Sequence, residues 1–273
     1  MVPSLSDLPS SLHYRSRRWE EALEAAGDFV DHLTLAEKAG MIIGTTGACL
    51  GDVAPISRLN LTGLCLQDGP QAIRNAPFVS VFPAQLSVEA SWDLLLAHQH
   101  AFYMGTEFCA KGAHVVLGPI AGPLGRSPFG GRNWEGFSLE AYLSGELVAV
   151  TIQAIQSAGA QAATKHYIIN KEEIQRNPTF SANRMTIEAI RSNIDDKGYV
   201  VSDWFTARAG VPSANASLNM NMPGSMNFLR KSASYFGENI TAAVNNGSLS
   251  SDRPRDMVVR ILIPYFHLKQ DKD

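Results

Sequence analysis

The sequence predicts an α/β fold of the TIM-type (β/α) barrel, and two observations carry that prediction. Strand-like and helical segments alternate along the 273-residue chain, which indicates βαβ units and a parallel sheet. One barrel of about 250 residues would occupy nearly this whole length. No repeat, low-complexity tract or linker divides the chain, so we expect residues 1–273 to form a single domain, with residues 1–18 as an N-terminal extension.

Two helices are expected before the first strand. Residues 15–33 have the periodicity of an amphipathic helix, and its candidate inward positions are Trp19, Leu23 and Phe29. Thr34 and Glu37 have the spacing of a capping box. That pair predicts the start of a second, short helix.

The next two helices share one pattern, in which a serine begins the helix and a glycine ends it. Ser91 is expected to cap a helix that runs to about residue 111 and stops at Gly112. Ser138 is expected to cap a helix that runs to about residue 157 and stops at Gly159. In the last helical segment, Pro264 should kink or end the helix.

The apolar runs between these helices predict strands. The clearest are residues 61–66, 113–117, 160–164 and 198–202. With weaker segments included, the sequence offers about six to seven strands, whereas a closed barrel of this type needs eight. We therefore expect an incomplete barrel.

Composition and charge exclude several classes of protein. A formal charge of −3 and a pI near 6.2 argue against nucleic acid or an anionic membrane as a partner. No apolar stretch reaches the ~20 residues that span a bilayer. Three cysteines, Cys49, Cys65 and Cys109, are too few for a zinc site or a disulfide framework. Buried free thiols are the expectation, with one pair as the alternative in an oxidising compartment. No metal or cofactor is expected.

Signals for cellular location conflict. The first residues lack a basic region followed by an apolar core, so no secretory signal is predicted and the chain as written would be cytoplasmic. Four Asn-X-Ser/Thr sequons, which are glycosylated only in secreted chains, begin at Asn60, Asn215, Asn239 and Asn246. The location is left open.

Polar residues close three of the predicted strands. They are Asp68, then Lys165 with His166, and then Asp203 with Trp204. Because the active site of a barrel lies at the C-terminal ends of its strands, these side chains are expected to converge. Charged groups bind sugar hydroxyls, and an indole face covers the apolar side of a sugar ring. The set therefore suits a carbohydrate site.

Each of these residues also has a simpler interpretation. Asp68, which precedes Gly-Pro, is typical of a turn, and Asp203 could cap a following helix. The pair Lys165 and His166 could begin a solvated loop, and Trp204 could be a core residue.

Several longer motifs contain the same residues. The most specific are Gly63-Leu-Cys-Leu-Gln-Asp-Gly-Pro70, Gly118-Pro-Ile-Ala-Gly-Pro-Leu-Gly-Arg126, Gly130-Gly-Arg-Asn-Trp-Glu-Gly-Phe137, Lys165-His-Tyr-Ile-Ile-Asn170 and Val201-Ser-Asp-Trp204. With these motifs the chain resembles the N-terminal catalytic barrel of glycoside hydrolase family 3, above all of fungal β-glucosidases. The resemblance runs from about Trp19 to the end of the chain.

The resemblance implies a retaining β-glucosidase that acts on β-D-glucosides without a metal or cofactor. Asp203 would be the catalytic nucleophile, and Trp204 would form a wall of the sugar site. The residues that would hold hydroxyls of the glucosyl unit are Asp68, Arg74, Arg132, Lys165 and His166.

Parts of the family pattern are missing. Retaining hydrolysis needs a second carboxyl group about 5–5.5 Å from the first. In the resembled family it comes from a following α/β-sandwich domain, which we expect to be absent here. The glutamates in matching motifs are Glu135, Glu172 and Glu173, but none of them matches the family's acid. A helix and strand that family members carry before Gly198 are also missing, because the flanks are fused at Lys197. Asn219 and Asn221 stand where the family usually has Asp and Ser.

Three interpretations therefore stay open. The chain is a β-glucosidase-type hydrolase impaired by the missing acid, a non-catalytic or recruited barrel that binds a sugar or another small molecule, or a truncated gene model. Family members are usually secreted, and the oligomeric state is not predicted. We expect the purified chain to hydrolyse ordinary β-glucosides poorly or not at all.

Overall fold

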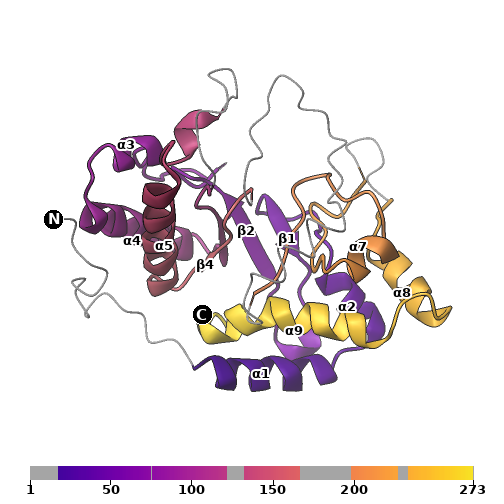
Figure 1. The fold of residues 1–273 in the computed structure, drawn as a ribbon. Helices are drawn as coiled ribbons and strands as arrows, with labels where there is room; N and C mark the ends of the chain where they lie inside the picture. Colours follow the sequence, from indigo (N-terminus) through magenta and orange to yellow (C-terminus); the bar gives the residue numbers. More distant parts are fainter. Residues whose placement is uncertain (1–17, 75, 122–131, 167–197, 227–232, 273) are drawn as a thin grey trace. The chain divides into compact units, whose positions relative to one another are not determined.

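Two compact units make up the chain in the computed structural model. The structure describes residues 18–74, 76–121, 132–166, 198–226 and 233–272 (Figure 1). Of these, residues 65–166 belong to unit 1, and residues 18–64 and 198–272 belong to unit 2. Among the described residues, unit 1 is thus one stretch of sequence, whereas unit 2 combines two stretches. The single domain over residues 1–273 stays a prediction.

Parallel strands form the sheet of unit 1. Its strands are β2 (Leu64–Asp68, of which residues 65–68 lie in the unit), β3 (Val115–Leu117) and β4 (Gln161–Ala162). Strand β3 pairs with β2 on one side and with β4 on the other, with Val115 opposite both Leu66 and Gln161. This confirms the predicted parallel pairing, since helices connect each strand to the next.

The helices of unit 1 pack on one another beside this sheet. They are α3 (Gln85–Glu89), α4 (Leu94–Ala110), η4 (Asn133–Glu135) and α5 (Ala141–Ser157). Helices α4 and α5 lie side by side (Figure 1). Gly105 of α4 permits this approach, because a Cβ atom there would lie 3.0 Å from the Cβ of Ala158. The buried apolar cluster consists of Val88, Leu94, Ala97, Phe137, Leu147 and Val150.

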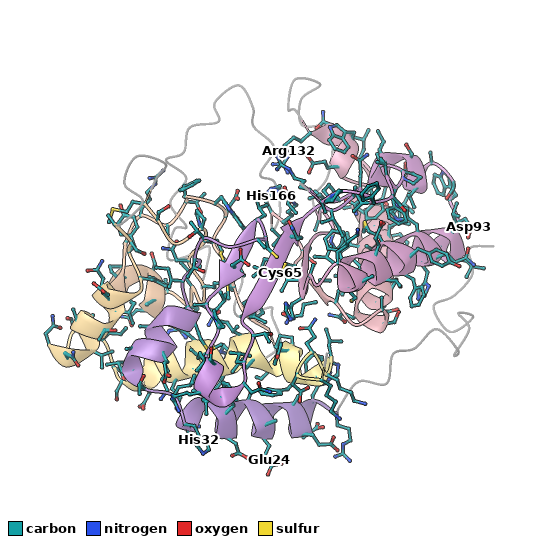
Figure 2. All side chains as sticks on the ribbon, turned by 180° about the vertical axis from the view of Figure 1, so that it is seen from behind. Glu24, His32, Cys65, Asp93, Arg132 and His166 are labelled. Carbon is teal, nitrogen blue, oxygen red and sulfur yellow. The ribbon has the colours of Figure 1, made fainter. Side chains whose placement is uncertain are left out.

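The predicted starts of α4 and α5 were wrong by two residues. Asp93 and Glu140 are the N-caps, and each carboxylate accepts hydrogen bonds from two backbone N–H groups of the first turn. Ser91 and Ser138 each accept one bond from the backbone N–H of the carboxylate residue that follows. A carboxylate at a helix N-terminus is favoured over a hydroxyl by its charge. Asp93 is labelled at the start of α4 in Figure 2.

Unit 2 contains the remaining elements. They are α1 (Trp19–Asp31), α2 (Leu35–Met41), β1 (Gly51–Val53), η3 (Ser57–Leu59), α7 (Val211–Asn215), α8 (Glu238–Asn245) and α9 (Asp252–His267). The capping box predicted for α2 is confirmed, because Thr34 and Glu37 each accept a bond from the other's backbone N–H.

Helices α1 and α9 lie side by side although they are far apart in sequence (Figure 1). Arg255 binds both carboxylate oxygens of Asp31, at 2.7 and 3.0 Å. Trp19 stacks on His267 with ring centroids 3.5 Å apart. An ion pair and a ring stack therefore join the first and last described helices of the chain.

The predicted inward face of α1 is correct only in part. Trp19 and Phe29 contact rings of α9, but Leu23 is exposed. The fully buried positions are Ala22, Ala26 and Val30. Small residues face α9 because two closely packed helices leave little room between their axes. Glu24 and His32 lie on the solvent side of this helix (Figure 2).

Pro264 lies inside α9 and does not end it, which excludes one of the two predicted outcomes, and a kink at this residue stays a prediction. The helix continues to His267, and the N–H of Leu268 donates to the carbonyl of Pro264 over 3.0 Å. The residues around the proline, from Ile261 to Phe266, are almost all buried. Burial of this apolar face offsets the one backbone hydrogen bond that proline removes.

The α/β class is confirmed, but a barrel of six to seven strands is not observed. Within the described ranges the strands form an open sheet of four, in the order β1-β2-β3-β4. The expected strand 198–202 is reduced to one parallel bridge between Val201 and Met220. Its ladder is interrupted because the N–H of Val200 donates to the side chain of Asn219 rather than to a backbone carbonyl.

The expectation of three free thiols is wrong. Cys49 and Cys65 are disulfide-bonded, whereas Cys109 is not, and its Sγ donates to the carbonyl of Ala158 over 3.4 Å. Composition alone could not identify the pair, because three cysteines allow three pairings. Over the described part of the chain, no helix is long and apolar enough to cross a bilayer. The same residues contain no cluster of acidic, histidine or cysteine side chains suited to a metal ion.

Candidate active site

A charged cluster lies at the C-terminal end of β2 in unit 1. Asp68, the last residue of the strand, accepts a hydrogen bond from the Nζ of Lys165 at one carboxylate oxygen. Its other oxygen accepts from the Nη1 of Arg74 over 3.0 Å. The Asp68 and Lys165 side chains are each 16% exposed, whereas Arg74 is 63% exposed. Asp68 therefore forms a largely buried ion pair with Lys165 and a second ion pair with the solvated Arg74.

The turn after β2 returns Arg74 to Asp68. The N–H of Arg74 donates to the carbonyl of Asp68 over 3.1 Å, which closes the turn. Gly69 is required in it, because a Cβ atom at that position would overlap the carbonyl oxygen of Ala72. Asp68 is thus a turn residue and a member of the cluster at once.

Backbone pairing fixes the position of Lys165. Its N–H donates to the carbonyl of Pro119 over 2.9 Å, and its own carbonyl accepts from Ala121 over 2.7 Å. These bonds continue the parallel pairing of β3 and β4 beyond the ends of the strands. The following residue, His166, is half-buried and joined to Lys165 by a cis peptide bond (Figure 2). Lys165 is therefore held in the fold rather than in a solvated loop.

The environment of Asp68 keeps its carboxyl group ionised. Burial alone would raise the pKa of Asp68, but the charge and hydrogen bond of Lys165 and the hydrogen bond of Arg74 outweigh it, so the pKa lies below its ordinary value. An ionised carboxylate accepts strong hydrogen bonds from hydroxyl groups. Lys165 carries three N–H donors and gives one of them to Asp68. The pair can therefore accept from one hydroxyl and donate to another.

Arg132 pairs with a glutamate of its own motif. It lies in η4's N-cap position with a left-handed backbone, and its Nε and Nη2 bind the two carboxylate oxygens of Glu135 at 2.6 and 2.8 Å. Glu135 is buried. Arg132 occupies both carboxylate oxygens of this buried side chain, so Glu135 is a poor candidate for the missing acid. Glu172 and Glu173 lie outside the described residues.

Asp203 lies on a turn of unit 2 and is exposed. Its Oδ1 accepts from the N–H of Trp204 over 2.7 Å, and its carbonyl accepts from the Oγ1 of Thr206 over 2.8 Å. The next described helix, α7, begins at Val211, so Asp203 does not cap a helix. Neither of the two bonds described here ends on the Oδ2 of Asp203.

Ser202 anchors this turn to a neighbouring segment. Its Oγ accepts from the N–H of Met222 over 2.9 Å. The carbonyl of Met222 in turn accepts from the N–H of Phe205 over 3.1 Å. Asp203 thus stands between two residues that are bound to Met222. Ser202 was not identified from the sequence, although its place directly before Asp203 was a usable signal.

The indole of Trp204 packs against a glycine. A Cβ atom on Gly51 would lie 3.0 Å from the Cζ2 of Trp204 and 3.3 Å from the Sδ of Met222. Gly51 therefore leaves the room that the ring occupies. The sequence gives no sign of this, because Gly51 lies more than 150 positions before Trp204.

Within unit 1 the structure brings Asp68, Arg74 and Lys165 together, and within unit 2 it brings Asp203 and Trp204 together. Asn219 and Asn221 serve the second group as structural residues. Asn219 accepts from the N–H of Val200 over 2.8 Å, and Asn221 contacts the hydroxyl of Ser202 at 3.4 Å. These amides join neighbouring extended segments.

Comparisons with known proteins give one consistent result. Residues 70–171 match the model of the glycosyl hydrolase family 3 N terminal domain. The chain is 43% identical to Probable beta-glucosidase G of Emericella nidulans, and the match covers 97% of this chain and 39% of that protein. The crystal structure of β-glucosidase D2-BGL from Chaetomella raphigera has a TM-score of 0.85 and 32% identity, with 94% of this chain and 42% of that one covered.

A more distant structure agrees in fold alone. β-Glucosidase 3B from Thermotoga neapolitana, solved with α-D-glucose, has a TM-score of 0.79 at 21% identity, over 91% of this chain and 44% of that chain. The chain thus spans about 40% of the length of the curated relatives it matches.

The alignment with the Emericella nidulans protein runs over 325 positions, of which 97% of this 273-residue chain supplies about 265. About 60 of the aligned positions therefore have no counterpart in this chain. The loss of a helix and strand before Gly198 stays a prediction.

Proposed function

Because the chain carries the N-terminal domain of glycoside hydrolase family 3 and is related to its β-glucosidases, we propose that it binds a glucosyl unit and supplies the nucleophile of a retaining β-glucosidase. The observation that carries the proposal is the cluster of Asp68, Lys165 and Arg74, in which an ionised carboxylate and two cations lie at the end of a strand.

The cluster has the donors and acceptors that a glucosyl unit requires. Vicinal hydroxyl groups present one donor and one acceptor side by side, which matches the carboxylate of Asp68 next to the ammonium of Lys165. Arg74 adds donors at the solvated side. We assign the further hydroxyl contacts to Arg132 and His166, by the motifs in which they stand.

Asp203 is the proposed nucleophile. Its carboxylate attacks the anomeric carbon, the bond to the leaving group breaks, and water then cleaves the glycosyl-enzyme. The N–H of Trp204 binds Oδ1, and the turn is anchored through Ser202, so one carboxylate oxygen is held on an anchored turn. Trp204 is the proposed apolar wall of the sugar site.

Glu135 is not placed to protonate the leaving group. That carboxylate is buried against Arg132. We therefore propose that the first half of the reaction proceeds with an activated leaving group, and that ordinary glucosides need a carboxyl group from elsewhere.

A mechanism-based reagent tests this assignment. The purified chain is incubated with 2,4-dinitrophenyl 2-deoxy-2-fluoro-β-D-glucoside, whose leaving group departs without protonation. We expect one fluoroglucosyl group on the peptide that contains Asp203, and no label in Asp203→Asn. The exposed carboxylate Asp28 supplies the matched control, because Asp28→Asn should be labelled as the unchanged chain is.

A second candidate is a sugar-binding protein without catalytic activity, which the engagement of Glu135 favours. It predicts glucose binding that depends on Lys165 and no labelling of Asp203. Labelling of Asp203 separates the two candidates, since calorimetry should detect glucose binding for both and only the first requires the label. Absence of both binding and labelling would overturn the proposed function.

A further inference from the structure

Unit 1 exposes far more apolar surface than unit 2. Among the described residues, every exposed large apolar side chain except Leu23 belongs to unit 1. Four of them are aromatic side chains of which more than half is exposed, namely Phe78, Trp92, Tyr103 and Tyr142. Single exposed apolar residues need no explanation, but a concentration of them marks an interaction surface.

The helices that carry much of this surface are almost uncharged. Helices α4 and α5 each have 17 residues, and each contains one charged residue, Glu107 and Glu146. Both of these residues are half-buried. By contrast, α1 has five carboxylates in 13 residues. A helix with so few charges on its outer side is typical of one that packs against another element there.

The outward residues of α4 follow a regular pattern. Leu96, Gln99, Tyr103, Thr106 and Ala110 are exposed, and they are separated alternately by three and four positions. That spacing places side chains along one face of a helix and is typical of the seam between two packed helices. We call these five residues the outer stripe of α4. The stripe is suited to a second helix, in addition to the side of α4 that packs on α5.

The outer stripe is complementary to its own reverse. An antiparallel copy of α4 centred on Tyr103 brings Leu96 opposite Ala110, a large side chain against a small one. It also brings the amide of Gln99 opposite Thr106, whose hydroxyl donates to a carbonyl within α4 and keeps an oxygen that can accept. Tyr103 then lies against its own copy, and aromatic rings pack favourably in offset or edge-on arrangements.

The two ends of α4 carry opposite charges. Asp93 is the N-cap (Figure 2), and Lys111 is the C-cap. Reversal of the helix places Asp93 of one copy near the partner's Lys111. Lys111 donates to the carbonyl of Pro77 over 3.0 Å, and an ammonium group has three donors. A parallel pair would instead set like charges side by side at both ends, so charge complementarity selects the antiparallel arrangement.

A loop extends the surface along the other side of α4. The N–H of Ser80 donates to the Oε1 of Glu107 over 2.7 Å, and the ring of Phe82 lies 5.6 Å from that of His100. These contacts hold the loop beside the centre of the outer stripe, which lies between positions 100 and 107. The loop nevertheless presents Phe78 to solvent on a left-handed backbone, with φ of 55°. A fixed loop that exposes an aromatic ring suits a binding surface.

The exposed rings supply most of the area that a stable interface requires. Phe78 is 96% exposed, Trp92 65%, Tyr103 62% and Tyr142 74%. Aromatic side chains bury about 150–250 Å² each, so these four present roughly 600 Å². An interface of standard size takes about 800 Å² from each partner. Exposed leucines of α4 and of the turn before α5 add to the rings.

We propose that unit 1 associates with a second copy of this chain through α4, in an antiparallel pair whose two-fold axis passes at Tyr103. The rotation that reverses α4 also places α5 against the partner's α5. A two-fold interface takes the same residues from both copies, so like charges would face one another wherever the surface is charged. The exposed residues of α4 between positions 95 and 110 are uncharged, which permits this pairing. The inference goes beyond the proposed function and does not rest on it.

Sedimentation equilibrium of the full chain tests the association. Interfaces of this size range from micromolar to tighter affinities, so the measurement spans about 0.1 to 100 μM. We expect a plateau at twice the chain mass of 29.6 kDa, with a Kd at or below about 10 μM. Tyr103→Glu sets two carboxylates against each other at the axis and should weaken association at least about tenfold. Leu23→Glu, at an exposed leucine of unit 2, is the matched control and should leave the Kd unchanged.

Cross-linking tests the orientation of the pair. One chain carries Leu96→Cys and another carries Ala110→Cys, both with Cys109→Ser. The two positions are about 21 Å apart along the helix, so an antiparallel pair brings position 96 only to position 110 of its partner. We expect a disulfide-linked dimer on mild oxidation of the mixture and none from either chain alone. Circular dichroism of each variant should match that of the unchanged chain, since the substituted positions 96, 103 and 110 are exposed.

Four results would overturn the proposal. They are a monomer at every concentration, a mass that rises without a plateau, a Kd that Tyr103→Glu leaves unchanged, and cross-linking of Leu96→Cys chains to one another. A monomer that is retained on insoluble β-glucan, with the retention lost in Tyr103→Glu, would assign the exposed rings to carbohydrate instead. None of these measurements involves hydrolysis or the cluster at Asp68, so their failure is distinct from a failure of the proposed function.

Discussion

Lys165 and Asp68 form an ion pair in which both side chains are 84% removed from solvent, since each is 16% exposed. Removal of Lys165 leaves the carboxylate of Asp68 with little access to water and with the solvated Arg74 as its remaining cation. We expect Lys165→Met to lower the free energy of unfolding by about 3 kcal/mol. The same change should weaken glucose binding at least about tenfold, or about 1.4 kcal/mol.

Arg74 supplies the matched comparison, because it binds the same carboxylate from a solvated position. Arg74→Gln should cost less than about 1 kcal/mol, as exposed ion pairs do. Urea unfolding of Lys165→Met, of Asp68→Asn and of the double variant gives the coupling energy of the ion pair, and Arg74→Gln is measured beside them. If Lys165→Met and Arg74→Gln lower the free energy of unfolding equally, the exposure of each cation does not determine how much it stabilises the fold.

The acid side of the stability curve should depend on Asp68. Its pKa in the folded chain is below the ordinary value of 3.8, because Lys165 and Arg74 outweigh the effect of burial. The unfolded chain therefore binds more protons near that pH, and stability falls as the pH decreases. Asp68 contributes its stabilisation fully above the ordinary pKa and loses it as the pH falls through the lowered one.

Unfolding measured between about pH 6 and pH 3 tests this sign. The slope of the free energy against pH should be steeper in the unchanged chain than in Asp68→Asn below about pH 4, and the two slopes should agree above about pH 5. A variant slope as steep as that of the unchanged chain would assign the acid sensitivity to other carboxyl groups.

Gly51 should control the position of the Trp204 ring. A methyl group at residue 51 would lie 3.0 Å from Cζ2, so either the ring or Met222 must move. We expect Gly51→Ala to cost about 1–3 kcal/mol and to weaken glucose binding. In a Trp204→Phe background the cost should be smaller, because the shorter ring leaves space. If Gly51→Ala lowers the free energy of unfolding equally in both backgrounds, the loss does not arise from contact with the indole of Trp204.

Two helical glycines of unit 1 should respond in opposite directions to the same change. Gly145 of α5 has open space where a Cβ atom would stand, so Gly145→Ala should stabilise by about 0.5–1 kcal/mol through helix propensity. Gly105 of α4 faces the Cβ of Ala158 at 3.0 Å, so Gly105→Ala should destabilise by about 1–3 kcal/mol. Thermal unfolding of both variants is sufficient, and stabilisation by Gly105→Ala would contradict the close packing of α4 on α5.

The sequence predicted local structure well where a single signal decided it. The capping box of Thr34 and Glu37 is present, and Gly112 and Gly159 follow helices in left-handed conformations as expected. Ser91 and Ser138 misled the prediction because Asp93 and Glu140, two residues later, are stronger acceptors at a helix N-terminus. Leu23 shows the related limit, since periodicity identifies a face but not which side chains a neighbouring helix has room to bury.

For the candidate site, the predicted grouping can be compared with the structure only within one unit, and the convergence of Asp203 and Trp204 with the residues of unit 1 stays a prediction. Asp68 and Lys165 meet as expected, because parallel strands end at the same edge of a sheet. The bond between Arg132 and Glu135 was not foreseen, since two residues three positions apart can meet only in a tight turn such as η4. Gly51 could not be found either, because an absent side chain leaves no pattern in a single sequence.

The pairing of α1 with α9 has a consequence for the order in which the molecule forms. The described strands and helices of unit 1 all lie between positions 65 and 166, so they can associate through contacts between near neighbours as they are synthesised. Unit 2 cannot join Asp31 to Arg255, or Trp19 to His267, until more than 200 intervening residues have been made. Until then, the apolar face of α1 stays without its partner and is open to chaperones.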